Sequence, residues 1–203
     1  MDPAKAKEIF NHLYADVSGS TLSLQGREAK GLTSKSFVYG EVTFDAFYKI
    51  LNEMHPQPGE TFCDLGSGTG KAVFMAYLLF QFSKTAGVEL VETLYDAAIA
   101  VQKRFEKEFH PALAAELGDR KLAFYNADLL DVDISNVDVL FMNSTCFQED
   151  LMAPLETKLE SVKSGSRILV LSKPLKSTEF SLLKQEKEEF SWGQATCFYY
   201  TRN

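Results

Sequence analysis

An acidic residue followed by alternating glycines is the feature of this sequence with the clearest chemical meaning. Asp64 comes directly after the strand-like residues 61–63 and opens the run Asp-Leu-Gly-Ser-Gly-Thr-Gly. Glycines at alternate positions let the backbone approach a ligand where a Cβ atom would clash. In the dinucleotide-binding pattern the third glycine would stand at position 71, but this chain has Lys71 there. The acid at position 64 suits a ligand that carries a cation. The glycines are Gly66, Gly68 and Gly70.

Three further polar residues stand where later strand-like runs end. Glu89 lies close to 20 residues beyond the glycines, a spacing at which an acid binds ribose hydroxyls. Asp128 ends a third strand-like run, where in nucleotide-binding α/β folds such an acid, or the backbone amide of the next residue, here Leu129, binds an adenine edge. Asn143 offers a carbonyl acceptor and an amide donor. The alternatives are a plain strand-to-helix turn at the glycines, a surface carboxylate at Glu89, a solvated acidic loop after Asp128 and a turn residue at Asn143.

These residues need parallel strands to bring them together, because ligands of open α/β sheets bind at the carboxyl ends of the strands. The chain alternates strand-like and helical segments, which predicts an α/β fold. The expected strands are residues 61–63, 84–90, 122–128, 137–143 and 166–171, with a closing antiparallel hairpin of 182–190 and 194–201. The expected helices are residues 3–17, 43–54, 71–82, 91–109 and 148–162. Residues 18–36 are rich in Gly, Ser, Thr and Lys and are predicted to form a long loop.

Composition limits the classes of function. The 203 residues suffice for one domain with a sizeable core, and no apolar run is long enough to span a membrane. The net charge of −7 argues against strong nucleic-acid binding and favours a basic protein partner. Three cysteines without a Cys-x-x-Cys pair indicate a reducing compartment, the cytoplasm or the nucleus. Three scattered histidines give no basis for a metal site, and we expect a monomer.

The acid, the glycine pattern and the alternating elements resemble the class I methyltransferases, which hold S-adenosylmethionine in this way. The resemblance implies a Rossmann-like, seven-stranded, mostly parallel sheet with a C-terminal antiparallel hairpin and a short N-terminal extension of helix and loop. Residues 1–54 would form N-terminal helices and a loop that covers the cofactor, and residues 55–203 the methyltransferase domain.

More specific motifs, in order, resemble the disruptor-of-telomeric-silencing family of non-SET histone lysine methyltransferases. The resemblance runs from residue 38 to the C-terminus. It rests on Tyr39-Gly40-Glu41, residues 64–70, Gly87-Val88-Glu89, Asn143 with Phe147, Gly165-Ser166-Arg167-Ile168, Ser172-Lys173-Pro174, Ser191-Trp192 and Tyr199-Tyr200. The chain departs from the family pattern at Val42, Ser144 and Thr145, and it lacks the family's basic extension.

The resemblance implies roles for individual residues. Tyr39 and Glu41 would belong to the loop that closes on S-adenosylmethionine. The methionine end would be held by Asp64 and Gly66, the ribose by Glu89 and the adenine by Asp128. The catalytic residues would be those that line a narrow channel for a substrate lysine: Asn143, Phe147 and Tyr199.

The reaction implied is a direct in-line displacement, in which a neutral lysine amine attacks the methyl group of the sulfonium. An aromatic channel would disfavour the charged amine by desolvation, so no strong general base is needed. The substrate would be a lysine presented by a protein, preferred over intact chromatin. Two alternatives remain open: a class I methyltransferase that acts on a small molecule or another residue type, and a cofactor-binding module that has lost catalysis.

Overall fold

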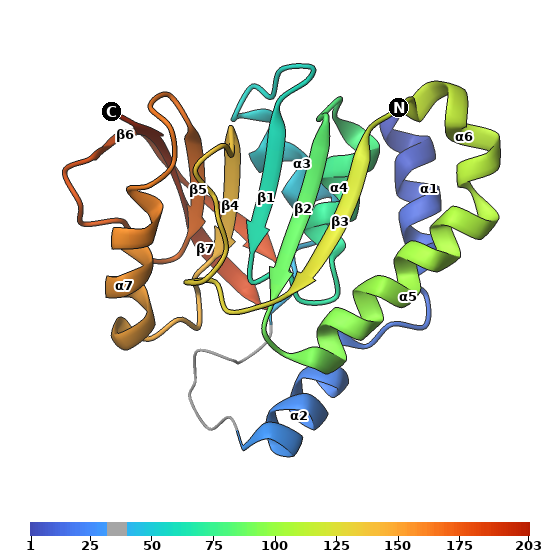
Figure 1. Ribbon diagram of the computed structural model, residues 1–203, viewed down its shortest axis with the longest axis horizontal. Helices are drawn as coiled ribbons and strands as arrows, with labels where there is room; N and C mark the ends of the chain where they lie inside the picture. The colour runs from blue at the N-terminus through green and yellow to red at the C-terminus, as the bar shows by residue number, and fades with distance from the viewer. Residues whose placement is uncertain (32–39) are drawn as a thin grey trace.

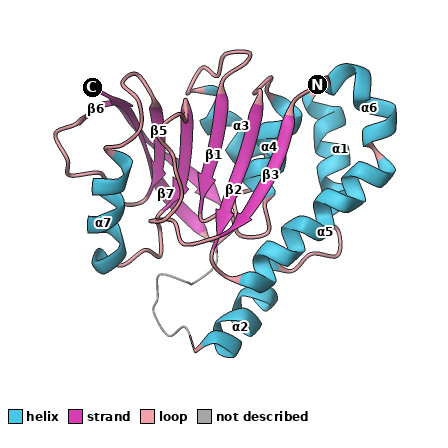
Figure 2. Cartoon of the chain, in the orientation of Figure 1, coloured by secondary structure: helices cyan, strands magenta, loops and turns pink. Residues whose placement is uncertain are grey.

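The computed structural model describes residues 1–31 and 40–203 and contains one mixed sheet with helices on its two faces (Figures 1 and 2). The helices are α1 Pro3–Tyr14, α2 Gly19–Lys30, α3 Phe44–Asn52, α4 Lys71–Leu79, α5 Glu92–Glu108, α6 His110–Leu117 and α7 Glu149–Leu159. The strands are β1 Thr61–Leu65, β2 Lys84–Glu89, β3 Lys121–Asn126, β4 Val139–Asn143, β5 Arg167–Leu171, β6 Phe180–Phe190 and β7 Gly193–Arg202.

The sheet has seven strands in the order β3-β2-β1-β4-β5-β7-β6. The first five in this order pair in parallel, and β7 pairs antiparallel with both β5 and β6. The fold class predicted from the sequence is therefore confirmed. Strand order reverses at β1 and β4, so the carboxyl ends of these two strands flank the switch point where open α/β sheets bind their ligands.

Sequence composition explains why the central strands form where they do. β4 and β5 are short and almost wholly buried, which suits strands covered on both faces. At the edge of the sheet, β6 carries charged residues at Lys184 and at positions 186–189, and these discourage pairing with another chain.

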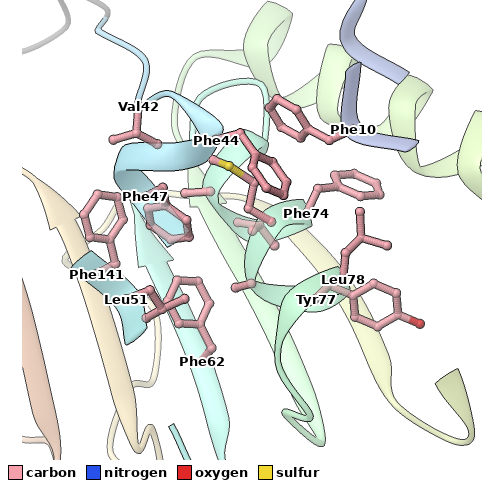
Figure 3. Close-up of a cluster of buried hydrophobic side chains, with 14 of the residues drawn as sticks. Phe10, Val42, Phe44, Phe47, Leu51, Phe62, Phe74, Tyr77, Leu78 and Phe141 are labelled. Carbon is pink, nitrogen blue, oxygen red and sulfur yellow. The ribbon is translucent and has the colours of Figure 1, made fainter. Parts of the chain in front are cut away.

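The larger core lies between the sheet and the helices α1, α3, α4 and α5. Figure 3 shows its aromatic centre, where rings from three helices and two strands meet. Phe47 of α3 packs against Phe141 of β4 with ring centroids 5.1 Å apart, and Phe62 of β1 lies 6.4 Å from Phe47. This packing fixes α3, and therefore the residues just before it, against the sheet.

A smaller core covers the opposite face. It contains α7 residues packed on β4, β5 and β7, together with apolar residues of the segment 127–137 that joins β3 to β4. In Figure 1 α3 and α4 lie behind the sheet, α1 lies beyond its β3 edge, and α7 lies on the β5 side. The two faces are thus covered unequally.

The predicted loop at residues 18–36 is wrong over its first part, because α2 occupies Gly19–Lys30. The helix packs against the start of α5, where Thr93 Oγ1 donates to the carbonyl of Leu22 at 2.7 Å. A Cβ atom on Gly26 would lie 2.2 Å from Thr93 Oγ1, so glycine allows the two helices to meet. Tertiary contact and the left-handed Gly31 cap therefore outweigh low helix propensity here. The rest of the predicted loop lies mostly outside the described residues.

No helix in the described ranges 1–31 and 40–203 has both the length and the apolarity needed to cross a bilayer.

Candidate functional site

A cavity of about 490 Å³ opens at the carboxyl ends of β1, β2 and β4. It gathers most of the residues that the sequence singled out, although they come from positions 40 to 192. Its lining includes Gly40, Glu41, Asp64, Gly66, Ser67, Lys71, Glu89, Asp128, Leu129, Asn143, Phe147 and Trp192.

The glycine turn, residues 66–70, forms the floor of the cavity, and its glycines have different structural roles. Gly66 has φ 86° and lines the cavity, where a Cβ atom would meet Phe147 Cζ at 3.3 Å. Gly70 has φ 84° and lies behind the cavity, where a Cβ atom would come within 2.6 Å of the Phe124 ring. The first glycine keeps the floor open, and the last lets α4 pack closely against β3.

Glu89 fastens the glycine turn to the end of β2. Its two carboxylate oxygens accept hydrogen bonds from the backbone N–H of Gly68 and of Val91, each at 2.8 Å. Burial raises the pKa of Glu89 above its usual value, and these N–H donors oppose the shift. Gly68 therefore takes part through its backbone bond to Glu89 rather than by lining the cavity. Both carboxylate oxygens keep lone pairs with which to bind a ligand.

Asp64, at the carboxyl end of β1, is the most electrostatically strained group in the cavity. It is 2% exposed, and its Oδ1 has no hydrogen-bond partner among the described residues. Burial raises its pKa well above the usual value, and the neighbouring charge of Glu89 adds to the effect. A buried acceptor without a partner costs free energy that a ligand ammonium can recover. Asp64 therefore fits the ammonium group of a methionine moiety.

Asp128 and Leu129 both line the cavity, but not at the end of a strand as predicted. β3 ends at Asn126, whose side chain donates to the carbonyls of Glu89 at 2.8 Å and of Leu90 at 3.2 Å. These side-chain bonds end the pairing of β2 with β3, and the chain continues as a loop. Asp128 follows in that loop, where its Oδ1 accepts from the N–H of Leu130 at 2.9 Å.

Glu41 joins the cavity from the segment that precedes α3. Its carboxylate forms an ion pair with Lys71 and accepts from Thr69 Oγ1 at 3.1 Å. Both contacts tie residue 41 to the glycine turn and the start of α4. Tyr39, which was predicted to act with Glu41, lies outside the described residues.

The other end of the cavity is built from segments far apart in the chain. Asn143 ends β4, and its side-chain amide donates to the carbonyl of Gly40 at 3.2 Å while its Oδ1 accepts from Thr145 Oγ1 at 2.7 Å. Phe147 and Trp192 place aromatic rings beside it. Trp192 stacks on Phe190 at 4.9 Å, and its Nε1 is buried without a partner among the described residues.

Trp192 was given no role by the sequence reasoning, although a signal for it exists. β6 runs parallel to β5, because both are antiparallel to β7. The turn between β6 and β7 therefore lies at the same edge of the sheet as the carboxyl end of β5. An aromatic residue in that turn is placed at the ligand crevice by topology alone.

Tyr199 does not line the cavity, which corrects the position predicted for it. It pairs with Leu169 in the middle of β5, and its side chain is 3% exposed within the larger core. Its hydroxyl donates to Glu186 Oε1 at 2.7 Å, and burial raises the pKa of that hydroxyl. The strand register holds Tyr199 inside the sheet, away from the strand ends.

Cysteines and metals add little to the site. Cys146 lines the cavity, whereas Cys63 and Cys197 are buried in strands, and burial raises the pKa of each of these two thiols to about 12. Within the part of the chain that the structure describes, no group of three or more His, Cys, Asp or Glu side chains is arranged to hold a metal ion.

The fold is that of the class I methyltransferases. An RNA methyltransferase from Salinibacter ruber, solved with S-adenosyl-L-homocysteine, superposes with a TM-score of 0.62 at 18% identity and covers 80% of this chain and 94% of its own. The magnesium protoporphyrin IX methyltransferase of Synechocystis PCC 6803, solved with bound S-adenosylmethionine, gives 0.57 at 13% identity over 97% of this chain and 90% of that one. At such identities the likeness concerns the fold.

The sequence matches the family described as "Histone methylation protein DOT1" over residues 27–200, so the chain belongs to that family. The histone-lysine N-methyltransferase, H3 lysine-79 specific, of Debaryomyces hansenii is 28% identical over 201 residues, which cover 91% of this chain and 16% of that protein. The protein of the same description from Caenorhabditis elegans is 29% identical over 147 residues, 69% of this chain and 15% of its own length. The chain thus spans only a small part of these relatives.

Proposed function

We propose that this chain is an S-adenosylmethionine-dependent methyltransferase that acts on a lysine side chain presented by a protein, a histone in the first instance. One observation carries the proposal. The cavity joins a buried carboxylate at Asp64, whose Oδ1 has no partner among the described residues, to an amide and two aromatic rings at Asn143, Phe147 and Trp192. The first end suits an amino-acid ammonium, and the second suits an amine that must lose its charge.

The residues of the first end would hold the cofactor, which supplies an electrophilic methyl group when bound. Asp64 would accept from the ammonium of the methionine moiety, and Gly66 leaves room beside it. Glu89, whose carboxylate lies between the glycine turn and β2, would accept from the ribose hydroxyls. The loop residues Asp128 and Leu129 would contact the adenine.

The residues of the second end would prepare the lysine. The rings of Phe147 and Trp192 exclude water, and desolvation favours the neutral amine that attacks the methyl group. Asn143 would orient that amine through its carbonyl oxygen, which Thr145 already aligns. The ring faces would also stabilise the positive charge of the transferring methyl group. The chain's contribution is position and electrostatics.

The partners follow from charge and family. Because the relatives are described as specific for lysine 79 of histone H3, a histone is the first substrate to test, and the nucleus is the corresponding compartment. Because the net charge is −7, we expect this chain alone to bind nucleic acid only weakly. We further propose that the chain is a monomer in which residues 1–54 act mainly as a cover for the domain that follows.

The test is methyl transfer from labelled S-adenosylmethionine to free histones, to nucleosomes and to a mixed cell lysate, each at low and moderate salt. We expect label in protein, on lysine, and its loss in Asn143→Ala. Label confined to the small-molecule fraction would reject a protein substrate, and binding without transfer would indicate an inactive module. Strong, salt-sensitive transfer to nucleosomes alone would contradict the weak nucleic-acid binding proposed here.

A further inference from the structure

The segments that follow β4 and β5 are joined by side-chain hydrogen bonds beside the cavity. The two strands are parallel neighbours, so both segments leave the sheet at its carboxyl edge. Ser144 Oγ donates to the carbonyl of Leu171 at 2.6 Å, and the hydroxyl oxygens of Thr145 and Ser172 lie 2.7 Å apart. Thr145 lines the cavity, and Ser172 lies behind it. Any effect of the Ser172 hydroxyl on the cavity therefore passes through Thr145.

The direction of each hydrogen bond in this group follows from one backbone carbonyl. The carbonyl of Gly40 can only accept, so the Asn143 atom that lies 3.2 Å from it is the amide nitrogen. The Asn143 carbonyl oxygen therefore faces the Thr145 hydroxyl, 2.7 Å away, and that hydroxyl has to donate to it. Because the hydroxyl proton of Thr145 is then used, its bond to Ser172 requires that Ser172 donates. The result is a chain of donors that runs from Ser172 through Thr145 to Asn143 Oδ1.

Among the described residues, this chain leaves Asn143 Oδ1 with one lone pair that is not strongly bonded. A carbonyl oxygen has two lone pairs, and the Thr145 hydroxyl takes one of them. The N–H of Thr145 lies 3.4 Å from the same oxygen, longer than an ordinary hydrogen bond, so the second lone pair remains available to a substrate amine. A rotated amide would instead present its N–H groups, which would bind the electron pair with which the amine attacks. The orientation of this side chain thus separates a productive site from a blocked one.

The backbone at Ser172 has a conformation that serine rarely adopts. Its φ is 71°, in the left-handed region that favours glycine. Two backbone hydrogen bonds hold it there: the Ser172 N–H donates to the carbonyl of Thr196 in β7 at 2.7 Å, and the Lys173 N–H donates to the carbonyl of Leu171 at 2.9 Å. Glycine would occupy this position with less strain, but it would lose the hydroxyl. Strain that glycine would avoid points to a role for the side chain.

We propose that Ser172, acting through Thr145, is a positioning residue for methyl transfer. The two hydroxyl groups hold the Asn143 side chain with its carbonyl oxygen toward the substrate amine. The proposal rests on the proposed function, because that function places the amine at this end of the cavity. Neither hydroxyl relays a proton, because the chain ends on an amide oxygen, which is not protonated at neutral pH. Their contribution is the orientation of one side chain.

The experiment compares four variants by methyl transfer from labelled S-adenosylmethionine to free core histones. Thr145→Val removes a hydroxyl at nearly constant shape, and Ser172→Gly removes one while it relieves the backbone. Thr145→Ser keeps the hydroxyl and is the conservative replacement. Ser144→Ala is the matched control, because it removes a hydroxyl bond between the same two segments that does not reach Asn143. The kcat and KM for histone, the affinity for S-adenosylhomocysteine and the melting temperature are measured for each variant.

We expect Thr145→Val to lower kcat about 10- to 100-fold and Ser172→Gly to lower it about tenfold, the scale of a small misplacement of a reacting group. KM and the affinity for S-adenosylhomocysteine should stay nearly unchanged. Ser172→Gly should keep or raise the melting temperature, because glycine adopts this backbone conformation readily. Thr145→Ser and Ser144→Ala should keep kcat near that of the wild type. A slower reaction without a loss of stability is a result that a merely structural role would not give.

A wild-type kcat in both Thr145→Val and Ser172→Gly overturns the proposal. An equal loss in Ser144→Ala also overturns it, because the bonds would then only join the two segments. The NMR signals of the Asn143 side-chain amide provide a measurement that needs no activity. They should move toward the shifts of a free asparagine in Thr145→Val and Ser172→Gly, and unchanged signals in both would reject the proposal. A wild type that transfers no methyl group, while these signals move in the variants, would instead reject the proposed function.

Discussion

The two ends of the cavity are built in opposite ways. Asp64 and Glu89 stand at the ends of adjacent parallel strands, and the Glu89 carboxylate is anchored by two backbone N–H groups. At the other end Asn143 reaches Gly40 with one bond of 3.2 Å across 103 positions of sequence, and Ser191 Oγ donates to the carbonyl of Glu41 at 3.2 Å. The first end is fixed by the sheet, and the second is held by a few side-chain bonds between distant segments.

Because they are built differently, the two ends contribute differently to binding and to methyl transfer. The first end stores unfavourable electrostatics, in the form of two neighbouring buried carboxylates, which a cationic ligand relieves. The second end stores less: its aromatic residues act by shape and desolvation, although the buried Nε1 of Trp192 has no partner among the described residues. Substitutions at the first end should therefore change binding and stability together, whereas substitutions at the second should change transfer with the folded state nearly unaffected.

Asp64→Asn should have the largest effect on binding and should sharpen the comparison most. The amide keeps the shape but removes the charge that meets the ligand ammonium, so we expect S-adenosylmethionine affinity to fall by about 2–3 kcal/mol. The cofactor-free protein should become more stable, by about 1 kcal/mol, because the substitution removes a buried acid whose Oδ1 has no partner among the described residues. Calorimetric titration and urea unfolding measure the two quantities, and a variant that is both weaker-binding and less stable would contradict the account.

Glu89→Ala should affect stability as well as binding. Removal of the carboxylate leaves the N–H groups of Gly68 and Val91 without their acceptor, which should lower the free energy of unfolding by about 1–3 kcal/mol. Affinity for S-adenosylmethionine should fall by a comparable amount. Urea unfolding in the absence of cofactor is the decisive measurement, because unchanged stability would reduce Glu89 to a ligand contact alone.

Trp192→Ala and Tyr199→Phe separate the second end from the core behind it. Trp192 lines the cavity, so its removal should lower the transfer rate about tenfold, equivalent to ~1.4 kcal/mol, with little change in cofactor affinity. Tyr199→Phe deletes the hydroxyl bonded to Glu186 and should cost about 1 kcal/mol of stability with transfer nearly unchanged. If Tyr199→Phe instead abolished transfer, the tyrosine would belong to the channel after all.

The smallest effect expected is on the pH dependence of stability. The folded-state pKa values of Asp64 and Glu89 lie above their ordinary values of 3.8 and 4.5, so the folded protein holds protons that the unfolded chain releases. Their contribution to stability is therefore greatest below about pH 4 and is lost as pH rises through the folded pKa values. Other carboxyl groups with a shifted pKa, such as Glu108 and Asp138, have lowered values. They change protonation at lower pH and contribute little to the pH dependence above about pH 4.

The measurement is urea unfolding of wild type and Asp64→Asn from pH 4 to pH 8 without cofactor. The advantage of the variant should widen with rising pH, by about 1.4 kcal/mol for each unit by which the Asp64 pKa is raised. A difference that stays constant over this range would show that Asp64 titrates normally.

The residues of the first end could be singled out from the sequence, and they line one cavity, because their signals are local. An acid at a strand end, a glycine turn and a second acid some 20 residues later, Glu89, are all read within one βαβ unit. Alternating strands and helices also predicted the sheet and its closing hairpin. The second end depends on register and crossing of distant segments, so Tyr199 was placed at the cavity and Trp192 was left without a role.

α2 shows the same limit outside the site. Its composition favours a loop, and nothing within residues 19–30 indicates the helix. The reason for it lies at the start of α5, where Thr93 and the preceding Val91 leave space that only a glycine at position 26 can share. Contacts of this kind between separate elements are not encoded by local propensity or periodicity.

Hydrogen exchange with and without S-adenosylmethionine tests the central claim most directly, because it maps where the cofactor binds. We predict added protection in the peptides that contain residues 64–70, 88–91 and 127–130, and no change in the edge strand β6 or in the segment 132–137 beyond the other end of the sheet. Protection at β6 or at 132–137, or no protection anywhere at saturating cofactor, would contradict the assignment of this cavity.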